Sequence, residues 1–223
     1  MRHFRFSKMG RRLSVGLGLG LCALGPLGVL GVSSATAMSI ASDSNANTVN
    51  IASEGPNHTL KFFWAINGSS TWNAELVAGA STTYSEPSLA TDSSASTVVL
   101  AAEGPNHTLD FYWAQDGTPG WHSEQVAGPG TTYSAPSISS DDSANTVNIV
   151  AEGPNHTLDF YWAINGSSTW NAEHIAGAST TYSAPSLAND KAANTVVIAA
   201  KAPAAGWTST GPPTAHRAGQ PSR

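Results

Sequence analysis

The chain contains three nearly identical copies of one segment, spaced 49 residues apart. The copies are Glu54–Ala65, Glu103–Ala114 and Glu152–Ala163. The match continues without a one-residue slip through Trp72, Trp121 and Trp170, and through the Thr-Tyr-Ser segments that begin at Thr83, Thr132 and Thr181. Self-similarity at a fixed period of this length is the signature of a tandem repeat architecture. The fold must therefore be built from one small unit used several times.

Each repeat contains four short segments of high strand propensity, separated by turn residues. In the second repeat they are Ser88–Ala90, Thr97–Ala102, Thr108–Trp113 and Trp121–Ala127. Thr97–Ala102 is apolar with little alternation, which is typical of a strand covered on both faces. Thr108–Trp113 alternates between apolar and polar residues, as a half-buried strand does. No stretch has helical periodicity, so the protein is expected to be all-β.

Four antiparallel strands in a repeat of this length predict an incomplete β-propeller with one four-stranded blade per repeat. The repeats span residues 38–200, with complete blades at 39–84, 88–133 and 137–182 and a half blade at 186–200. A β-trefoil also uses three four-stranded repeats and is the alternative. It gives no reason for a fourth unit to begin.

These repeats, with their Glu-Gly-Pro-Asn-His turn followed by an aromatic strand, resemble those of secreted actinobacterial β-propeller proteins. In layout the chain is similar to the seven-bladed fucose-binding propeller lectins, over Ser39–Ala200. The resemblance implies carbohydrate binding. The basic side chain that often helps to hold the sugar in those lectins has no repeated counterpart here, because Asp110 and Asp159 stand where the first repeat has Lys61.

Residues 1–37 have the features of a secretory signal peptide. Five basic residues precede the apolar run 13–32, and a small-residue site follows at Ala35-Thr36-Ala37. A membrane anchor is the rival interpretation, but the run contains six glycines and Pro26. We therefore expect cleavage after Ala37, a secreted extracellular product and no stable insertion into a membrane.

Removal of this leader changes the charge and leaves no cysteine. Five basic residues and fifteen carboxylates remain, which is a net charge of −10, and Cys22 is lost. An acidic protein is a poor partner for nucleic acid or for acidic sugars. Neither a disulfide nor a thiolate metal site is available to the exported chain.

The repeat stops after Ala200, and residues 201–223 have the composition of a disordered tail. A frame shifted by one base permits the string LDFYWA over Gly206–Gly211, which would continue the repeat. A second hypothesis is therefore that the tail is frameshifted and that the chain is a truncated fragment of a longer propeller.

Two sets of repeated residues are the candidate ligand-binding site. They are the tryptophans Trp72, Trp121 and Trp170 and the glutamates Glu75, Glu124 and Glu173. An indole can stack on a sugar ring while a carboxylate accepts hydrogen bonds from its hydroxyls. The alternative for these tryptophans is wedge packing between blades. Trp64, Trp113 and Trp162 are expected in the core, and His58, His107 and His156 at hairpin corners that bond nearby backbone or water.

No catalytic residues, metal site or cofactor are predicted. Everything reactive is repeated by the symmetry of the fold, whereas an active site needs one asymmetric constellation. The sequence therefore predicts a non-catalytic, multivalent module for neutral glycans or a cell-surface polysaccharide. A structural or protein-interaction propeller is the alternative. Because three and a half blades leave open sheet faces, self-association is also expected.

Overall fold

The computed structural model describes residues 38–118, 120–190, 195–203 and 216–218. The predicted signal peptide and most of the predicted tail lie outside these residues. Within the described part, no helix is long and apolar enough to cross a membrane.

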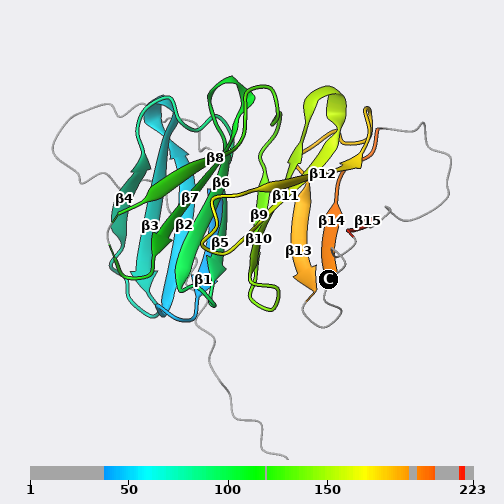
Figure 1. Ribbon diagram of the computed structural model, residues 1–223. Coiled ribbons are helices and arrows are strands. Elements are labelled where there is room, and N and C mark those ends of the chain that lie inside the picture. The colour runs from blue at the N-terminus through cyan, green and yellow to red at the C-terminus, as the bar shows by residue number, and fades with distance from the viewer. Residues whose placement is uncertain (1–37, 119, 191–194, 204–215, 219–223) are drawn as a thin grey trace, which may run out of the picture. The chain divides into compact units, whose positions relative to one another are not determined.

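Three four-stranded antiparallel sheets follow one another along the chain, each with its strands in sequence order (Figure 1). The first contains β1 (Met38–Asp43), β2 (Thr48–Gly55), β3 (Thr59–Ile66) and β4 (Asn73–Ala78). The second contains β5 (Ser88–Asp92), β6 (Thr97–Glu103), β7 (Leu109–Gln115) and β8 (His122–Ala127). The third contains β9 (Ser137–Asp141), β10 (Thr146–Glu152), β11 (Leu158–Ile164) and β12 (Asn171–Ala176). We call these sheets blades 1, 2 and 3.

Blade 4 has three described strands, in the order β13 (Ser186–Asp190), β14 (Thr195–Ala199) and β15 (His216–Ala218). The sequence predicts only the first two, and β15 adds a short pairing in which Arg217 lies opposite Val197. The predicted incomplete propeller is confirmed, with strand ends within two residues of those expected in blade 2. The trefoil is excluded, because each repeat forms a sheet of its own.

Burial follows the polarity pattern of each strand. All seven residues of β6 are buried, as expected for a strand covered on both faces. In β7 the antiparallel register sets Phe111 opposite Ala101 and Trp113 opposite Val99. The ladder between the third and fourth strands shifts by one residue at the same place in blades 1, 2 and 3, which in blade 2 is between Leu109 and Asp110.

The blades pack face to face through apolar clusters, one between each successive pair. Their first strands β1, β5, β9 and β13 lie next to one another. In blades 1, 2 and 3, a serine on the first strand accepts a hydrogen bond from a backbone N–H of the next blade. These bonds run from Leu89 to Ser39 over 3.0 Å, from Ile138 to Ser88 over 3.0 Å and from Leu187 to Ser137 over 3.1 Å.

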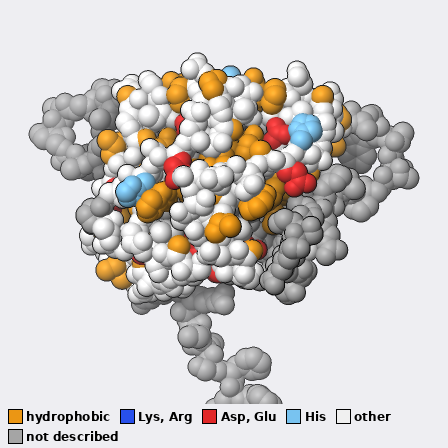
Figure 2. All heavy atoms as spheres, viewed as in Figure 1, with side chains coloured by type: hydrophobic (Ala, Val, Ile, Leu, Met, Phe, Trp, Pro, Cys, Tyr) orange, Lys and Arg blue, Asp and Glu red, His pale blue; other side chains and the backbone are white. Residues whose placement is uncertain are grey.

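A histidine at each hairpin corner links its blade to the segment that leads to the next one. The corners are the 3₁₀ turns Pro56–His58, Pro105–His107 and Pro154–His156. In blade 2, His107 Nδ1 lies 2.6 Å from Glu103 Oε1, and its ring stacks on Tyr133 with a centroid distance of 4.4 Å. The imidazole thus bonds a carboxylate, where the sequence predicts backbone or water. Figure 2 shows histidines beside acidic side chains on the face in view.

Candidate functional site

The predicted tryptophans and glutamates lie at the outer strands of the blades. Glu75, Glu124 and Glu173 stand in β4, β8 and β12, where the antiparallel register sets them opposite Phe62, Phe111 and Phe160. Trp72, Trp121 and Trp170 each occupy the position just before one of these strands.

The structure pairs two of the tryptophans, Trp121 and Trp170, each with the glutamate of the preceding blade. Trp121 Nε1 donates to Glu75 Oε2 over 3.0 Å, and Trp170 Nε1 donates to Glu124 Oε2 over 3.2 Å. The sequence sets Trp121 beside Glu124 and Trp170 beside Glu173 within one repeat. The hydrogen-bonded pairs form across blades instead.

Trp121 and Trp170 also pack between the blades. Trp121 meets Phe62 edge to face at a centroid distance of 5.0 Å, and Trp170 meets Phe111 in the same way at 5.1 Å. Each is half-buried against the apolar cluster at its junction. These two tryptophans therefore do contribute to the wedge packing that was one of the two predicted roles.

The outermost members of the two sets are not brought together. Trp72 is 44% exposed, because no described blade precedes the first one. Glu173 is exposed on β12. Of the six predicted residues, the structure thus assembles four, in two pairs.

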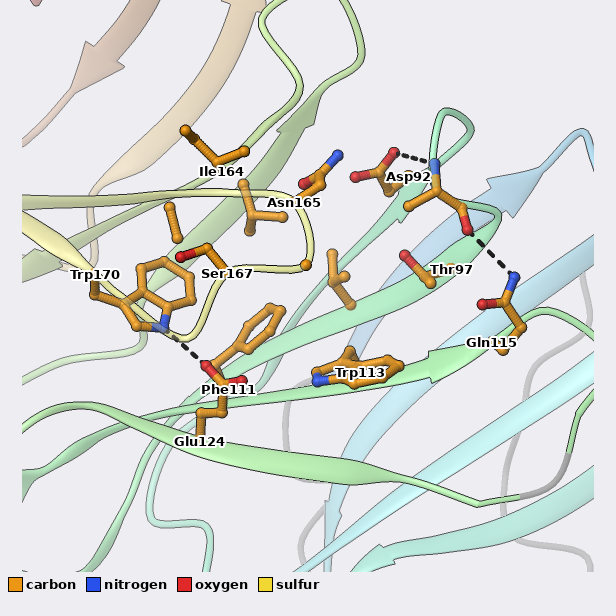
Figure 3. A pocket seen from close by; sticks show the side chains of 15 residues that line it. Asp92, Thr97, Phe111, Trp113, Gln115, Glu124, Ile164, Asn165, Ser167 and Trp170 are labelled. Carbon is orange, nitrogen blue, oxygen red and sulfur yellow. Dashed lines mark hydrogen bonds between the residues drawn. The ribbon is translucent and has the colours of Figure 1, made fainter.

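Trp170 lines a pocket of about 230 Å³ between blades 2 and 3, so packing and pocket-lining roles coexist in one residue. Trp113 and Phe111 from β7 and Glu124 from β8 form one wall. Asn165 and the turn that follows β11 close the opposite side, as Figure 3 shows. Trp113 is partly buried against the apolar cluster between these blades, in line with its predicted core position, and one side of its indole also lines this wall.

The pocket is acidic. Burial alone would raise the pKa of Asp92, but hydrogen bonds from the Ser94 hydroxyl and from the backbone N–H groups of Ala95 and Ser94 lower it below its ordinary value. Asp92 is therefore ionised at neutral pH. Among the described residues that line the pocket, none is Lys, Arg or His. Within the described part of the chain, no group of three or more His, Cys, Asp or Glu side chains is placed to hold a metal ion.

The hydrogen bonds of the tryptophan indoles at the junction between blades 1 and 2 differ from those at the junction between blades 2 and 3. Glu75 accepts a second hydrogen bond, from Trp64 Nε1 to Oε1 over 3.0 Å, so that one carboxylate joins tryptophans of two blades. At the next junction the equivalent of Trp64 is Trp113, which stacks on His122 with a centroid distance of 4.1 Å. The repeats are thus similar in sequence but not identical in bonding.

Sequence reasoning missed a carboxylate contact at the same junction. Asp116 follows β7 and faces Asp43 at the end of β1. Burial, the charge and hydrogen bond of Asp43, and the charge of Asp92 together raise the pKa of Asp116 to about 6. The repeat did hold a signal, because the equivalent positions in the other two blades are the neutral Asn67 and Asn165.

Comparison with known proteins supports the fold. The BP39L lectin from Burkholderia pseudomallei superposes with a TM-score of 0.65 at 14% identity, over 75% of this chain and 49% of the lectin. AofleA from Arthrobotrys oligospora gives 0.59 at 12% identity, over 75% and 50%. A mutant NanB sialidase from Streptococcus pneumoniae gives 0.56 at 10% identity, over 72% and 26%.

The chain thus has a lectin-like propeller fold and spans about half the length of the first two of these structures. No protein-family model matches its sequence. No curated protein matches it either.

Proposed function

We propose that this protein is a secreted, non-catalytic module that binds neutral glycans in the pockets between its blades. The observation that carries the proposal is the pocket between blades 2 and 3, where two indoles and a carboxylate converge. Trp113 and Trp170 offer apolar surface for the face of a sugar ring, and Glu124 offers an acceptor for its hydroxyls. The lectin fold of a structural neighbour is consistent with this use.

The charge of the pocket argues for a ligand without acidic groups. Asp92 and Glu124 both belong to its lining, and no basic side chain among the described lining residues would offset the charge of a sialic or uronic acid. Neutral hexoses, or the neutral units of a cell-surface polysaccharide, avoid that repulsion.

Repetition of such pockets would make binding multivalent. A site that stacks one sugar and holds it with one carboxylate gives affinities of about millimolar to tens of micromolar. Several such sites on one surface raise the overall affinity by avidity. Self-association of the chain would increase the number of sites further.

One observation favours a structural role at the other junction. Both oxygens of Glu75 accept indole N–H groups of the protein itself, which leaves this carboxylate less able to bind a ligand. An interaction or structural propeller therefore remains the second candidate, and it predicts the same core without sugar affinity.

A broad neutral-glycan array tests the proposal, with Glu124→Gln as the variant and Glu173→Gln as the matched control. Both changes replace a carboxylate by an amide on an outer strand, but only Glu124 lines the pocket. We expect the wild type and Glu173→Gln to be retained by the same glycans, and Glu124→Gln to bind about tenfold more weakly, because a charged acceptor makes the stronger hydrogen bond. A wild type that binds nothing on the array would refute the glycan proposal in favour of the interaction scaffold.

A further inference from the structure

The first and last blades each present an apolar sheet face with no neighbouring sheet among the described residues. Blade 1 packs against blade 2 on one face only, and blade 4 packs against blade 3 on one face only. On the other faces, Ile40 of β1 is 66% exposed and Val197 of β14 is 40% exposed. Apolar side chains with this exposure on one face of a sheet mark a surface that another element could cover.

The open face of blade 1 repeats one side of an interface that the chain already makes. Its residues Ile40, Val49 and Ile51 have the same identities, two repeats later, in blade 3 at Ile138, Val147 and Ile149. In blade 3 these side chains belong to the cluster at the junction with blade 2, where Ile138 is 5% exposed and Ile149 is fully buried.

The open face of blade 4 repeats the other side of that same interface. Its residues Ala188, Val197 and Ala199 have the same identities, two repeats earlier, in blade 2 at Ala90, Val99 and Ala101. In blade 2, Val99 is 2% exposed and Ala101 is fully buried, and both lie in the cluster shared with blade 3. The two open faces are therefore the two halves of the junction between blades 2 and 3.

We propose that a second copy of this chain docks head to tail, with blade 1 of one copy on blade 4 of the other. In this contact Ile40 would pack on Val197 and Ala188 of the other copy. Within the chain, the equivalent residues Ile138, Val99 and Ala90 already share one apolar cluster. It would also extend the serine series, because Ser186 continues Ser39, Ser88 and Ser137, and Ile40 stands where Leu89, Ile138 and Leu187 donate their backbone N–H.

A head-to-tail contact forms a closed ring only if the rotation between copies returns to the start. The propeller neighbours suggest that two copies suffice, since the chain overlays 49% and 50% of their lengths. Two copies would thus supply about one full propeller. The proposed glycan pocket lies within a single chain, so the association can fail without affecting the glycan proposal.

Light scattering on the purified protein at about 50 µM, a concentration suited to ordinary association strengths, tests the contact. Ile40→Asp damages the blade 1 face, and Val197→Asp damages the blade 4 face. Ser123→Asp is the control, because it adds the same charge at an exposed position on β8 of blade 2. Thermal melting verifies that every variant is folded.

We expect the wild type and Ser123→Asp to show about twice the mass of one chain, and each face variant alone to be monomeric. An equal mixture of Ile40→Asp and Val197→Asp should recover the dimer, because each mixed pair retains one undamaged junction. A monomeric wild type would overturn the proposal. So would a Val197→Asp protein that stays dimeric, since that result would mean that two blade 1 faces pair with each other.

Discussion

Trp121 of blade 2 donates its indole N–H to Glu75 of blade 1, and Trp64 of blade 1 donates to the other oxygen of the same carboxylate. The two residues of the inter-blade bond are separated by 46 positions in the sequence. This hydrogen bond connects the outer parts of two blades, whereas the serine hydrogen bonds connect their first strands.

Glu75→Gln should destabilise the protein by about 1–3 kcal/mol. An amide is neutral and has one oxygen acceptor, so one of the two indole N–H groups loses its acceptor altogether, and a half-buried donor without a partner carries that cost. Urea unfolding measures the change. Glu173→Gln is the control, because Glu173 is exposed, and an equal loss of stability in both variants would mean that the indole bonds contribute nothing.

Gly104→Ala should lower stability by about 1–3 kcal/mol, because the new Cβ would collide with the side chains of Asp110 and Thr108. Those two groups hydrogen-bond to each other over 3.1 Å and are partly buried, so neither moves away freely. Gly177→Ala is the matched control, since a Cβ there meets no atom within 4 Å. Chemical denaturation distinguishes the two variants, and a neutral Gly104→Ala would contradict the close approach.

The stability of the protein should depend on the ionisation of Asp116. Its pKa is raised to about 6 by burial and by the charges of Asp43 and Asp92, above the ordinary value of 3.8. A group whose pKa is higher in the folded state stabilises that state at low pH, and its contribution is lost as pH rises through the folded pKa. The ionisation of Asp116 should therefore make the melting temperature fall as the pH rises from about 4 to about 7, with little further change above that range.

The repeats supply a reciprocal pair of variants for that pH dependence. Asp116→Asn copies the residue of blade 3 and should raise the melting temperature at pH 7.5 while flattening its pH profile. Asn165→Asp introduces a carboxylate at the junction that contains Asp92 and should create a similar dependence there. Identical pH profiles for the wild type and Asp116→Asn would show that Asp43 and Asp116 do not repel each other in solution.

The exported protein should begin at Met38, which is also the first residue of β1. Cleavage after Ala37 would then leave the first strand whole. Intact-mass analysis of material from the growth medium measures the start of the chain. A product that remains in the membrane with residues 1–37 attached would contradict secretion.

The blades could be predicted from the sequence because their information is local. Alternation in Thr108–Trp113, the continuous apolar strand Thr97–Ala102 and the turn at Gly104–Asn106 all act within one repeat, and the 49-residue period fixes where each recurs. Strand ends moved by one or two residues, which is the usual effect of tertiary hydrogen bonding on a boundary.

The site was harder to predict because its contacts cross between sheets. The packing of one blade against the next decides which glutamate accepts the hydrogen bond of Trp121. Strand propensity does not contain that information. The Asp43–Asp116 contact has the same origin, although a column-by-column comparison of the repeats isolates Asp116 among asparagines. The stacking of His107 on Tyr133 could also have been suspected, since the Glu, His and Tyr positions recur together in every complete repeat.

The most direct test of the central claim is to observe the indole N–H signals of the tryptophans by NMR during titration with the neutral oligosaccharide that the array retains best. Single Trp→Phe variants assign the signals. We predict that the signals of Trp113 and Trp170 shift together and saturate between about tens of micromolar and millimolar ligand, while that of the exposed Trp72 stays in place. Unchanged Trp113 and Trp170 signals, with binding still detected by another method, would place the ligand outside this pocket and contradict the proposal.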